Sequence, residues 1–221
     1  MNHSAKRTDL LKLILTILTG VSLAFFILTS SVMLTLSMKW TYRLSQDDII
    51  QVEHQLDEAT IVHNYDTLID YMFAGPDTRL TFKELPMSPE GEFHFWEVKV
   101  IFQNFFRAML ISGFLTLLIS AVLIRERDLR FLNLGSILVF LVPALLAIPV
   151  ALNFDRAFVV FHEIAFSNDY WIFDPVRDPI IRYLPQSLFL KNTLIILVII
   201  IFWIFLIQGL KQRLKSRTPK G

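Results

Sequence analysis

Four long apolar stretches separated by polar segments dominate the pattern of hydrophobic and polar positions along this chain. A helix needs about 20 mostly apolar residues to cross roughly 30 Å of hydrocarbon, and each stretch has a suitable length. The pattern therefore predicts an all-α polytopic membrane protein with four transmembrane helices. The predicted spans are residues 11–38, residues 90–124 with a more polar outer beginning, residues 131–152 and residues 192–210.

Charged residues are divided unevenly between the segments that flank these spans. Residues 1–10, 125–130 and 211–221, together with Lys12, hold eleven basic and three acidic residues, whereas the remainder holds ten basic and seventeen acidic residues. Basic residues are retained on the cytoplasmic side of a membrane. We therefore predict that both termini and the 125–130 link are cytoplasmic, and that residues 39–89 and 153–191 face outward.

The outward segments predict a small, mostly helical extracytoplasmic cap. Ser88 followed by Pro89 is typical of a helix N-terminus, because serine caps the first turn and proline fits its first position. Capping residues, hydrophobic positions at helical spacing and a turn containing glycine and proline predict the other parts of the cap. The other predicted parts are a helix from Ser45 through Ala59, a helix from Asn64 to the turn at Gly75, and an extended segment or short strand over residues 79–86.

Composition supports a membrane protein and removes several classes of function. Hydrophobic residues make up 54% of the chain and charged residues 19%, against roughly 45–50% apolar residues in globular proteins. The absence of cysteine removes disulfide frameworks, thiol catalysis and thiolate metal sites. A net charge of +1 gives no global support for a nucleic-acid partner. Nucleotide-binding loops and the serine-hydrolase elbow are also missing.

Two of the five histidines, His94 and His162, lie in apolar surroundings at the predicted outer membrane boundary. Burial lowers the pKa of an imidazole and a nearby carboxylate raises it, so these rings are candidate bases near neutral pH. A packing role is the alternative. No recognised metal-ligand spacing includes them, so no metal is predicted. The other histidines, predicted to be inert or solvated, are His3, His54 and His63, and the candidate carboxylate partners are Glu92, Glu97, Glu163 and Asp169.

Further polar and aromatic residues lie at the same predicted level. Snorkelling toward headgroups is an alternative role for the arginine among them. The candidate substrate-binding or oxyanion-stabilising groups are Asn104, Arg107, Asn168 and Trp171. An aromatic belt at the membrane boundary is the simplest explanation for most outer aromatic residues, which are Trp40, Tyr42, Trp96, Tyr170, Trp171 and Tyr183.

Two segments of the chain resemble the signature segments of a known family. They are MSPEGEFHFWEVKVIF at residues 87–102 and FDRAFVVFHEIAFSNDYWIFDPVRDPIIRYLP at residues 154–185. Both are similar to Lit, the lipoprotein intramolecular transacylase, a family of four-span bacterial membrane proteins. The resemblance implies that His94 and His162 are the catalytic histidines. One departure is Glu97, which stands where the family has an aspartate.

The resemblance also implies an acyl shift within diacylated lipoproteins of Gram-positive bacteria. One acyl chain moves from the sn-2 position of the S-diacylglyceryl cysteine to the α-amino group of the same residue, giving a lyso-form lipoprotein. His94 is expected to act as the base, and His162 to polarise the ester or protonate the departing glycerol oxygen. The implied site lies at the outer leaflet of the bacterial cell membrane.

The expected partners are the diacylated lipoprotein and membrane lipid, with no cofactor, no obligate protein partner and no nucleic acid. This expectation agrees with the chemistry, because donor ester and acceptor amine belong to one molecule. Two alternatives stay open. One is a non-catalytic protein that binds lipid or lipoprotein at the membrane surface, and the other is an interfacial esterase that transfers the acyl chain to water.

Overall fold

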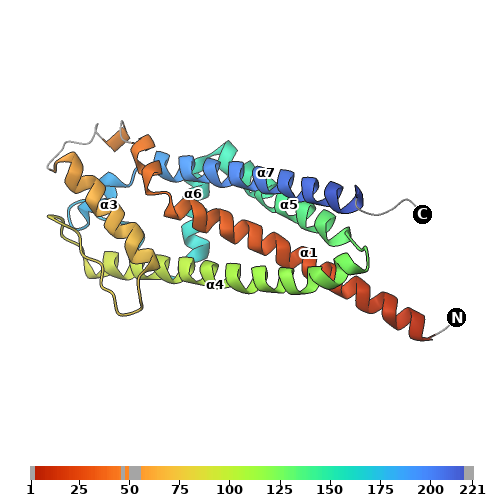
Figure 1. Cartoon of the computed structure of the whole chain (residues 1–221). Coiled ribbons are helices and arrows are strands. Elements are labelled where there is room, and N and C mark those ends of the chain that lie inside the picture. The colour runs from red at the N-terminus through yellow and green to blue at the C-terminus, as the bar shows by residue number, and fades with distance from the viewer. Residues whose placement is uncertain (1–2, 46–47, 50–55, 217–221) are drawn as a thin grey trace. The chain divides into compact units, whose positions relative to one another are not determined.

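The computed structural model describes residues 3–45, 48–49 and 56–216, and over these residues it contains helices and no strand (Figure 1). Four helices are long and apolar enough to cross a membrane, which confirms an all-α polytopic membrane fold. They are α1 (His3–Ser37), α4 (Pro89–Arg125), α5 (Arg130–Leu152) and α7 (Gln186–Ser216). The shorter helices are η1 (Lys39–Ser45), α3 (Glu58–Phe73), α6 (Phe154–Ala165) and η2 (Pro179–Tyr183).

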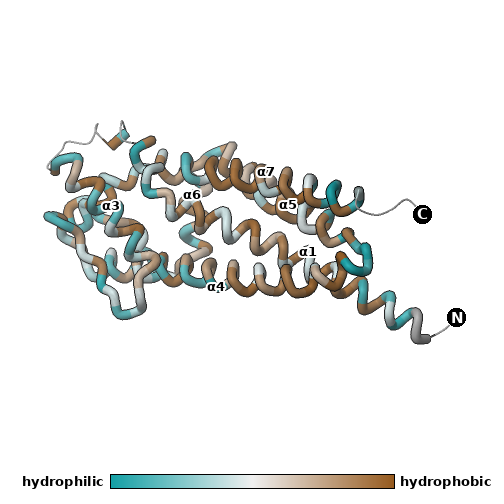
Figure 2. The backbone as a smooth tube through the Cα atoms, viewed as in Figure 1, coloured by the Kyte–Doolittle hydropathy of each residue, from teal (hydrophilic) through white to brown (hydrophobic). Residues whose placement is uncertain are grey.

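The chain forms two compact units, each built from several segments of the sequence. The first unit contains Met1–Val32, Phe106–Leu146 and Ile196–Gly221, and the second contains Met33–Phe105 and Ala147–Ile195. Hydrophobic residues follow the four long helices for much of their length, whereas hydrophilic residues are frequent on α3 (Figure 2). Each unit has its own cluster of buried hydrophobic side chains.

Helices of the first unit pack closely where glycine leaves room for a neighbouring side chain. A Cβ atom at Gly20 would lie 2.8 Å from Leu134 Cδ2, and one at Gly135 would lie 2.8 Å from Leu23 Cδ2. Small residues allow such close approach between membrane helices. Ser22 Oγ also donates a hydrogen bond of 2.9 Å to the backbone oxygen of Ser112. Close packing and hydrogen bonds thus hold α1 against α5 and α4.

A buried carboxylate holds the short connection between α4 and α5. Asp128 accepts hydrogen bonds from Arg130 Nη2 at 2.7 Å, from Arg130 N at 3.0 Å and from Thr16 Oγ1 at 3.1 Å. The Arg130 side chain, followed by the other donors, lowers the pKa of Asp128 to about 2. The connection is thereby tied to α1.

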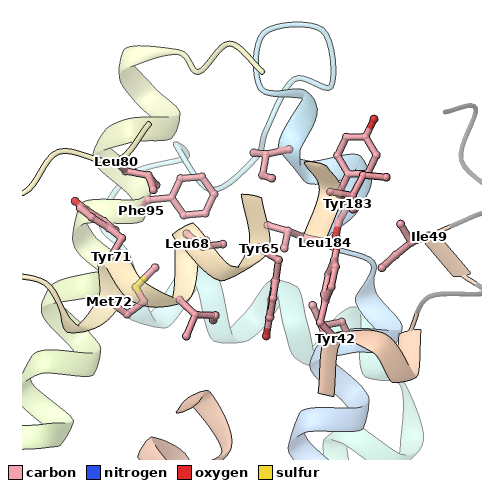
Figure 3. Close-up of a cluster of buried hydrophobic side chains, with 14 residues drawn as sticks. Tyr42, Ile49, Tyr65, Leu68, Tyr71, Met72, Leu80, Phe95, Tyr183 and Leu184 are labelled. Carbon is pink, nitrogen blue, oxygen red and sulfur yellow. The ribbon is translucent and has the colours of Figure 1, made fainter. Parts of the chain in front are cut away.

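Helix α3 supplies the largest share of the hydrophobic cluster in the second unit (Figure 3). Its Tyr65 ring stacks on Tyr42, with ring centroids 4.0 Å apart, and the Tyr42 hydroxyl donates a hydrogen bond of 2.7 Å to the backbone oxygen of Tyr183. Tyr42 and Tyr183 are therefore core residues, and an aromatic belt does not account for these two of the six outer aromatic residues. The α3 members of the cluster are Ile61, Tyr65, Leu68, Ile69, Tyr71 and Met72.

The C-terminal end of α3 is held by two side chains of α4. Lys99 Nζ donates a hydrogen bond of 2.7 Å to the backbone oxygen of Gly75 and lies 4.2 Å from the centroid of the Tyr71 ring. Gln103 Nε2 donates a hydrogen bond of 3.0 Å to the backbone oxygen of Ala74. These donors satisfy carbonyl groups that follow the last turn, and the lysine charge also suits this end of a helix dipole.

The structure corrects two predictions about this unit. Helix α3 begins at Glu58 rather than Asn64, because the Asp57 side chain accepts a hydrogen bond of 2.6 Å from Thr60 N. Of the two alternatives for residues 79–86, the strand is not formed, and the Asn64 side chain binds both backbone groups of Lys83 at 2.7 and 3.0 Å. The helix predicted from Ser45 through Ala59 falls largely outside the described residues, and its last predicted position, Ala59, belongs to α3.

The N-terminus of α4 follows its predicted capping pattern. Ser88 Oγ accepts a hydrogen bond of 3.0 Å from Gly91 N, and Pro89 is the first helical residue. The carboxylate of Asp178 accepts hydrogen bonds of 2.7 Å from both Ser88 N and Ser88 Oγ. A Cβ atom at Gly91 would collide with Asp178 Oδ1. The segment before η2 is therefore fixed against the first turn of α4.

Candidate active site

Helix α6 carries His162 as its one buried residue among those described. The helix begins after Asn153, whose side chain accepts a hydrogen bond of 2.9 Å from Arg156 N. Phe161 and Ile164 on the same helix are 57% and 81% exposed. An apolar helix with this surface suits an interface with lipid, while the imidazole points into the protein.

The backbone of α6 sets the tautomer of His162. Its Nδ1 atom lies 2.7 Å from the backbone oxygen of Phe158. A carbonyl oxygen only accepts, so Nδ1 carries the proton and Nε2 of the neutral ring carries a lone pair. Burial also lowers the pKa of His162, which keeps the ring neutral at neutral pH. His162 can therefore accept a proton at Nε2.

The first turns of α4 place His94 beside this ring. The centroids of the His94 and His162 rings lie 6.0 Å apart, and His94 is 5% exposed. Its Nδ1 atom is buried and has no hydrogen-bond partner. The structure thus brings together the two histidines that the sequence selected. At this separation both rings can act on one bound substrate.

Aromatic rings surround both imidazoles. Phe166 contacts the two of them, with its ring centroid 4.6 Å from that of His94 and 5.6 Å from that of His162. Phe173 lies 5.5 Å from His94, and Trp171 lies 4.9 Å from His162. Such a lining excludes water and strengthens electrostatic interactions within the site.

Phe166 and Phe173 were not among the residues selected from the sequence. The available signal was the density of aromatic residues between His162 and Asp174. Trp171, selected as an oxyanion donor, contributes a ring beside His162 at an interplanar angle of 30°. These contacts depend on how the chain folds back after α6, which periodicity does not reveal.

Glu97 and Asn168 form one contact between α4 and the segment that follows α6. Asn168 Nδ2 donates a hydrogen bond of 2.9 Å to Glu97 Oε1, and Asn168 Oδ1 accepts one of 3.0 Å from Tyr170 N. Glu97 Oε2 is buried without a hydrogen-bond partner. Because Nδ1 of His94 is also without a partner, the carboxylate does not bind that ring atom.

The remaining predicted site residues lie in other surroundings. Glu92 forms a two-pronged ion pair with Arg79, with hydrogen bonds of 2.7 and 2.9 Å. Asp169 and Asn104 are exposed. Asn104 lies roughly 15 Å beyond His94 along α4, at about 1.5 Å per residue. Arg107 belongs to the first unit.

The other histidines and Glu163 are exposed or are not described, so among the described residues the site contains two imidazoles and no third ionisable group from this set. Glu163 is exposed on α6 and His63 is exposed on α3. His54 lies outside the described residues, and the side chain of His3 is not described. Over residues 3–45, 48–49 and 56–216, no group of three or more His, Cys, Asp or Glu side chains is arranged to hold a metal ion.

Comparison with known proteins gives one family. The sequence model described as lipoprotein intramolecular transacylase Lit matches residues 17–189. The chain is also similar to the in meso structure of the membrane-integral lipoprotein intramolecular transacylase Lit from Bacillus cereus. The two are 33% identical with a TM-score of 0.89, and the match covers 95% of this chain and 98% of that chain.

Two further structures of the Bacillus cereus protein carry a substitution of one histidine, by arginine in one and by alanine in the other. Each is 31% identical to this chain and covers 97% of it. The TM-scores are 0.87 and 0.88, and the matches cover 96% and 98% of those chains. No curated protein sequence matches this chain.

Proposed function

This chain belongs to the Lit family of lipoprotein intramolecular transacylases and is an acyltransferase of the membrane, and on that premise we propose that it shifts one acyl chain within a diacylated lipoprotein. The donor is the sn-2 ester of the S-diacylglyceryl cysteine, and the acceptor is the α-amino group of the same residue. The observation that carries the proposal is the pair of buried imidazoles with centroids 6.0 Å apart.

Chemistry within one molecule suits this site. The ester C–O bond breaks, a C–N bond forms, the nitrogen loses a proton and the glycerol oxygen gains one. Because donor and acceptor are already joined, holding them in one geometry removes the entropy loss of a second binding event. The conversion of an ester and an amine to an amide and an alcohol is downhill, so the reaction needs no coupled energy source.

We assign the proton transfer to His162, which reverses the sequence-based assignment of the base to His94. The Phe158 carbonyl holds Nδ1–H, so Nε2 is the atom that takes the amine proton and then passes it to the departing glycerol oxygen. His94 polarises the ester. Its unpartnered Nδ1, when it carries the ring proton, donates to the ester carbonyl oxygen as negative charge develops there.

The proposed site faces the outer leaflet, with both chain termini in the cytoplasm. The excess of basic residues at the termini and in the 125–130 link supports this orientation. Large apolar side chains of α6 and the following segment support contact with lipid. Their exposed fractions are 57% for Phe161, 81% for Ile164, 63% for Ile172 and 77% for Val176. The acyl chains of the substrate can then remain in the bilayer during transfer.

Mass spectrometry of one diacylated lipoprotein tests the proposal. The lipoprotein is incubated in vesicles with the purified protein, and its N-terminal peptide is fragmented before and after. We expect an unchanged total mass with one acyl group relocated to nitrogen. An unchanged fragment pattern indicates binding alone, and loss of one acyl mass indicates an esterase, so either result contradicts the proposal. A preparation of His162→Ala is the matched control.

A further inference from the structure

One carboxylate oxygen of Glu97 accepts a hydrogen bond, and the other has no hydrogen-bond partner. Oε1 accepts the hydrogen bond of Asn168, whereas Oε2 is buried and accepts none. Leaving a buried polar group unpaired costs about 1–3 kcal/mol, and more when the group is charged. Native structures rarely retain such groups without a functional reason. The position of this oxygen therefore indicates that a ligand donates to it.

The unpartnered oxygen lies on the same face of α4 as the first imidazole. His94 stands three positions before Glu97, and side chains at this spacing share a helix face with roughly 5–6 Å between their Cβ atoms. His94 Nδ1 is also buried without a partner. One helix face thus places the carboxylate acceptor of Glu97 near the His94 Nδ1 atom, which is proposed above to donate to the ester carbonyl.

The carboxylate of Glu97 suits a cationic group with several N–H donors. The protonated α-amino group of the substrate has three N–H donors and a positive charge, and charge-assisted hydrogen bonds are shorter and stronger than neutral ones. The rings of Phe166 and Phe173 beside His94 are also favourable for a cation, because an aromatic face attracts positive charge. An ester group has no hydrogen-bond donor, and the secondary amide formed on the α-nitrogen has one N–H and no charge.

We propose that Glu97 is the specificity-determining residue that recognises the free α-ammonium group of the lipoprotein's N-terminal cysteine. This inference rests on the proposed function above. Oε2 accepts a hydrogen bond from the ammonium group, and Asn168 is a positioning residue that holds Oε1. A lipoprotein that is already N-acylated leaves the carboxylate unpaired and is rejected. Before attack, the bound ammonium group loses one proton to solvent, and the neutral amine then reacts as described above, with its second proton passing through His162 to the glycerol oxygen. The product amide carries no charge, so Glu97 no longer holds it.

Two unreactive substrate analogues test this role. Both are lipopeptides with an S-dialkylglyceryl cysteine, whose ether linkages cannot transfer an acyl chain, and they differ only in a free or an acetylated α-amino group. Binding of each is measured to the wild-type protein, to Glu97→Gln and to Glu97→Asp. We expect the wild-type protein to prefer the free amine by about tenfold or more, Glu97→Gln to lose the preference, and Glu97→Asp to retain part of it.

Equal affinity of the wild-type protein for the two analogues overturns the inference, and this comparison holds even where Glu97→Gln does not fold. A full preference in folded Glu97→Gln overturns it as well. Glu163→Gln, a matched change on an exposed part of α6, is the control and keeps the preference. Acyl transfer by the wild-type protein on an ester substrate is measured in parallel. Transfer without an amine preference removes only the role of Glu97, whereas absence of transfer removes the proposed function.

Discussion

At the scale of single residues, the proposed chemistry depends most on His162, because its tautomer leaves Nε2 as a proton acceptor. His162→Ala is expected to lower the rate of lyso-form lipoprotein formation by roughly 10²–10⁴-fold, the usual contribution of a positioned general base. The rate is measured by mass spectrometry at matched protein abundance. His63→Ala, a change at an exposed position on α3, serves as the control and retains full activity. Activity of His162→Ala near the wild-type level would remove this ring from the mechanism.

The pH dependence of the reaction reports the protonation state of His162. Burial lowers the pKa of His162 from its ordinary value of 6.5. The neutral ring is the active form, so kcat stays constant near neutral pH and declines as the pH falls through the lowered pKa. The acidic limb of a plot of kcat against pH is therefore expected below pH 6.5. The α-amino group of the substrate titrates separately, with an ordinary pKa of about 7.7–8.0, so the limb of His162 is the one that His162→Ala removes. If that limb lies above pH 6.5, the pKa of the ring is raised rather than lowered, contrary to its burial among aromatic side chains.

At the scale of elements, the start of α4 depends on Asp178, which binds two donor atoms of Ser88. Asp178→Ala leaves a buried N–H and a buried hydroxyl without their acceptor. The expected loss is about 1–3 kcal/mol of unfolding free energy, measured by thermal or denaturant unfolding of the purified protein in detergent. Glu163→Ala changes an exposed carboxylate and is expected to remain within about 0.5 kcal/mol of the wild-type protein. Equal stability of the two variants would mean that the carboxylate contributes nothing at α4.

Sequence patterns predicted the elements whose cause is local. Four apolar stretches of spanning length predicted the long helices, and Ser88 with Pro89 predicted the start of α4. The start of α3 was missed because the Asp57 cap lies outside the hydrophobic pattern. The short strand, one of two alternatives for residues 79–86, is absent, and the side-chain amide of Asn64 binds the backbone groups of Lys83, a contact that no alternation of residues encodes.

The histidine pair was predictable in part. Apolar surroundings and family resemblance selected His94 and His162, but spacing alone gives no distance between residues on different helices. The contact of the Phe166 ring with both imidazoles and the link from Asn168 to Glu97 both arise where the chain turns back after α6. Tyr42 and Tyr183 likewise resemble belt residues in sequence, and their burial and their hydrogen bond identify them as core.

At the scale of the whole molecule, the absence of cysteine makes the proposed orientation directly measurable. Glu163→Cys on α6 is expected to react with a membrane-impermeant maleimide in intact cells. Glu126→Cys, between α4 and α5, is expected to react only after the membrane is permeabilised. Both positions are exposed, so a difference in labelling reports the side of the membrane. The opposite pattern would place the histidine pair on the cytoplasmic side.

The collision between a Cβ at position 91 and the Asp178 carboxylate limits how this protein can be recombined with its relatives. One chimera takes residues 87–102 from a relative and keeps residues 154–185 of this chain. Its first turn of α4 must then pack against the Asp178 carboxylate, which leaves no space for a side chain at position 91. The reciprocal chimera places residues 154–185 of this chain, with the Asp178 carboxylate, against the first turn of another protein's helix, where donors equivalent to Ser88 N and Oγ are required. Although the two segments are far apart in the sequence, we expect that functional hybrids will be those that inherit both from one parent.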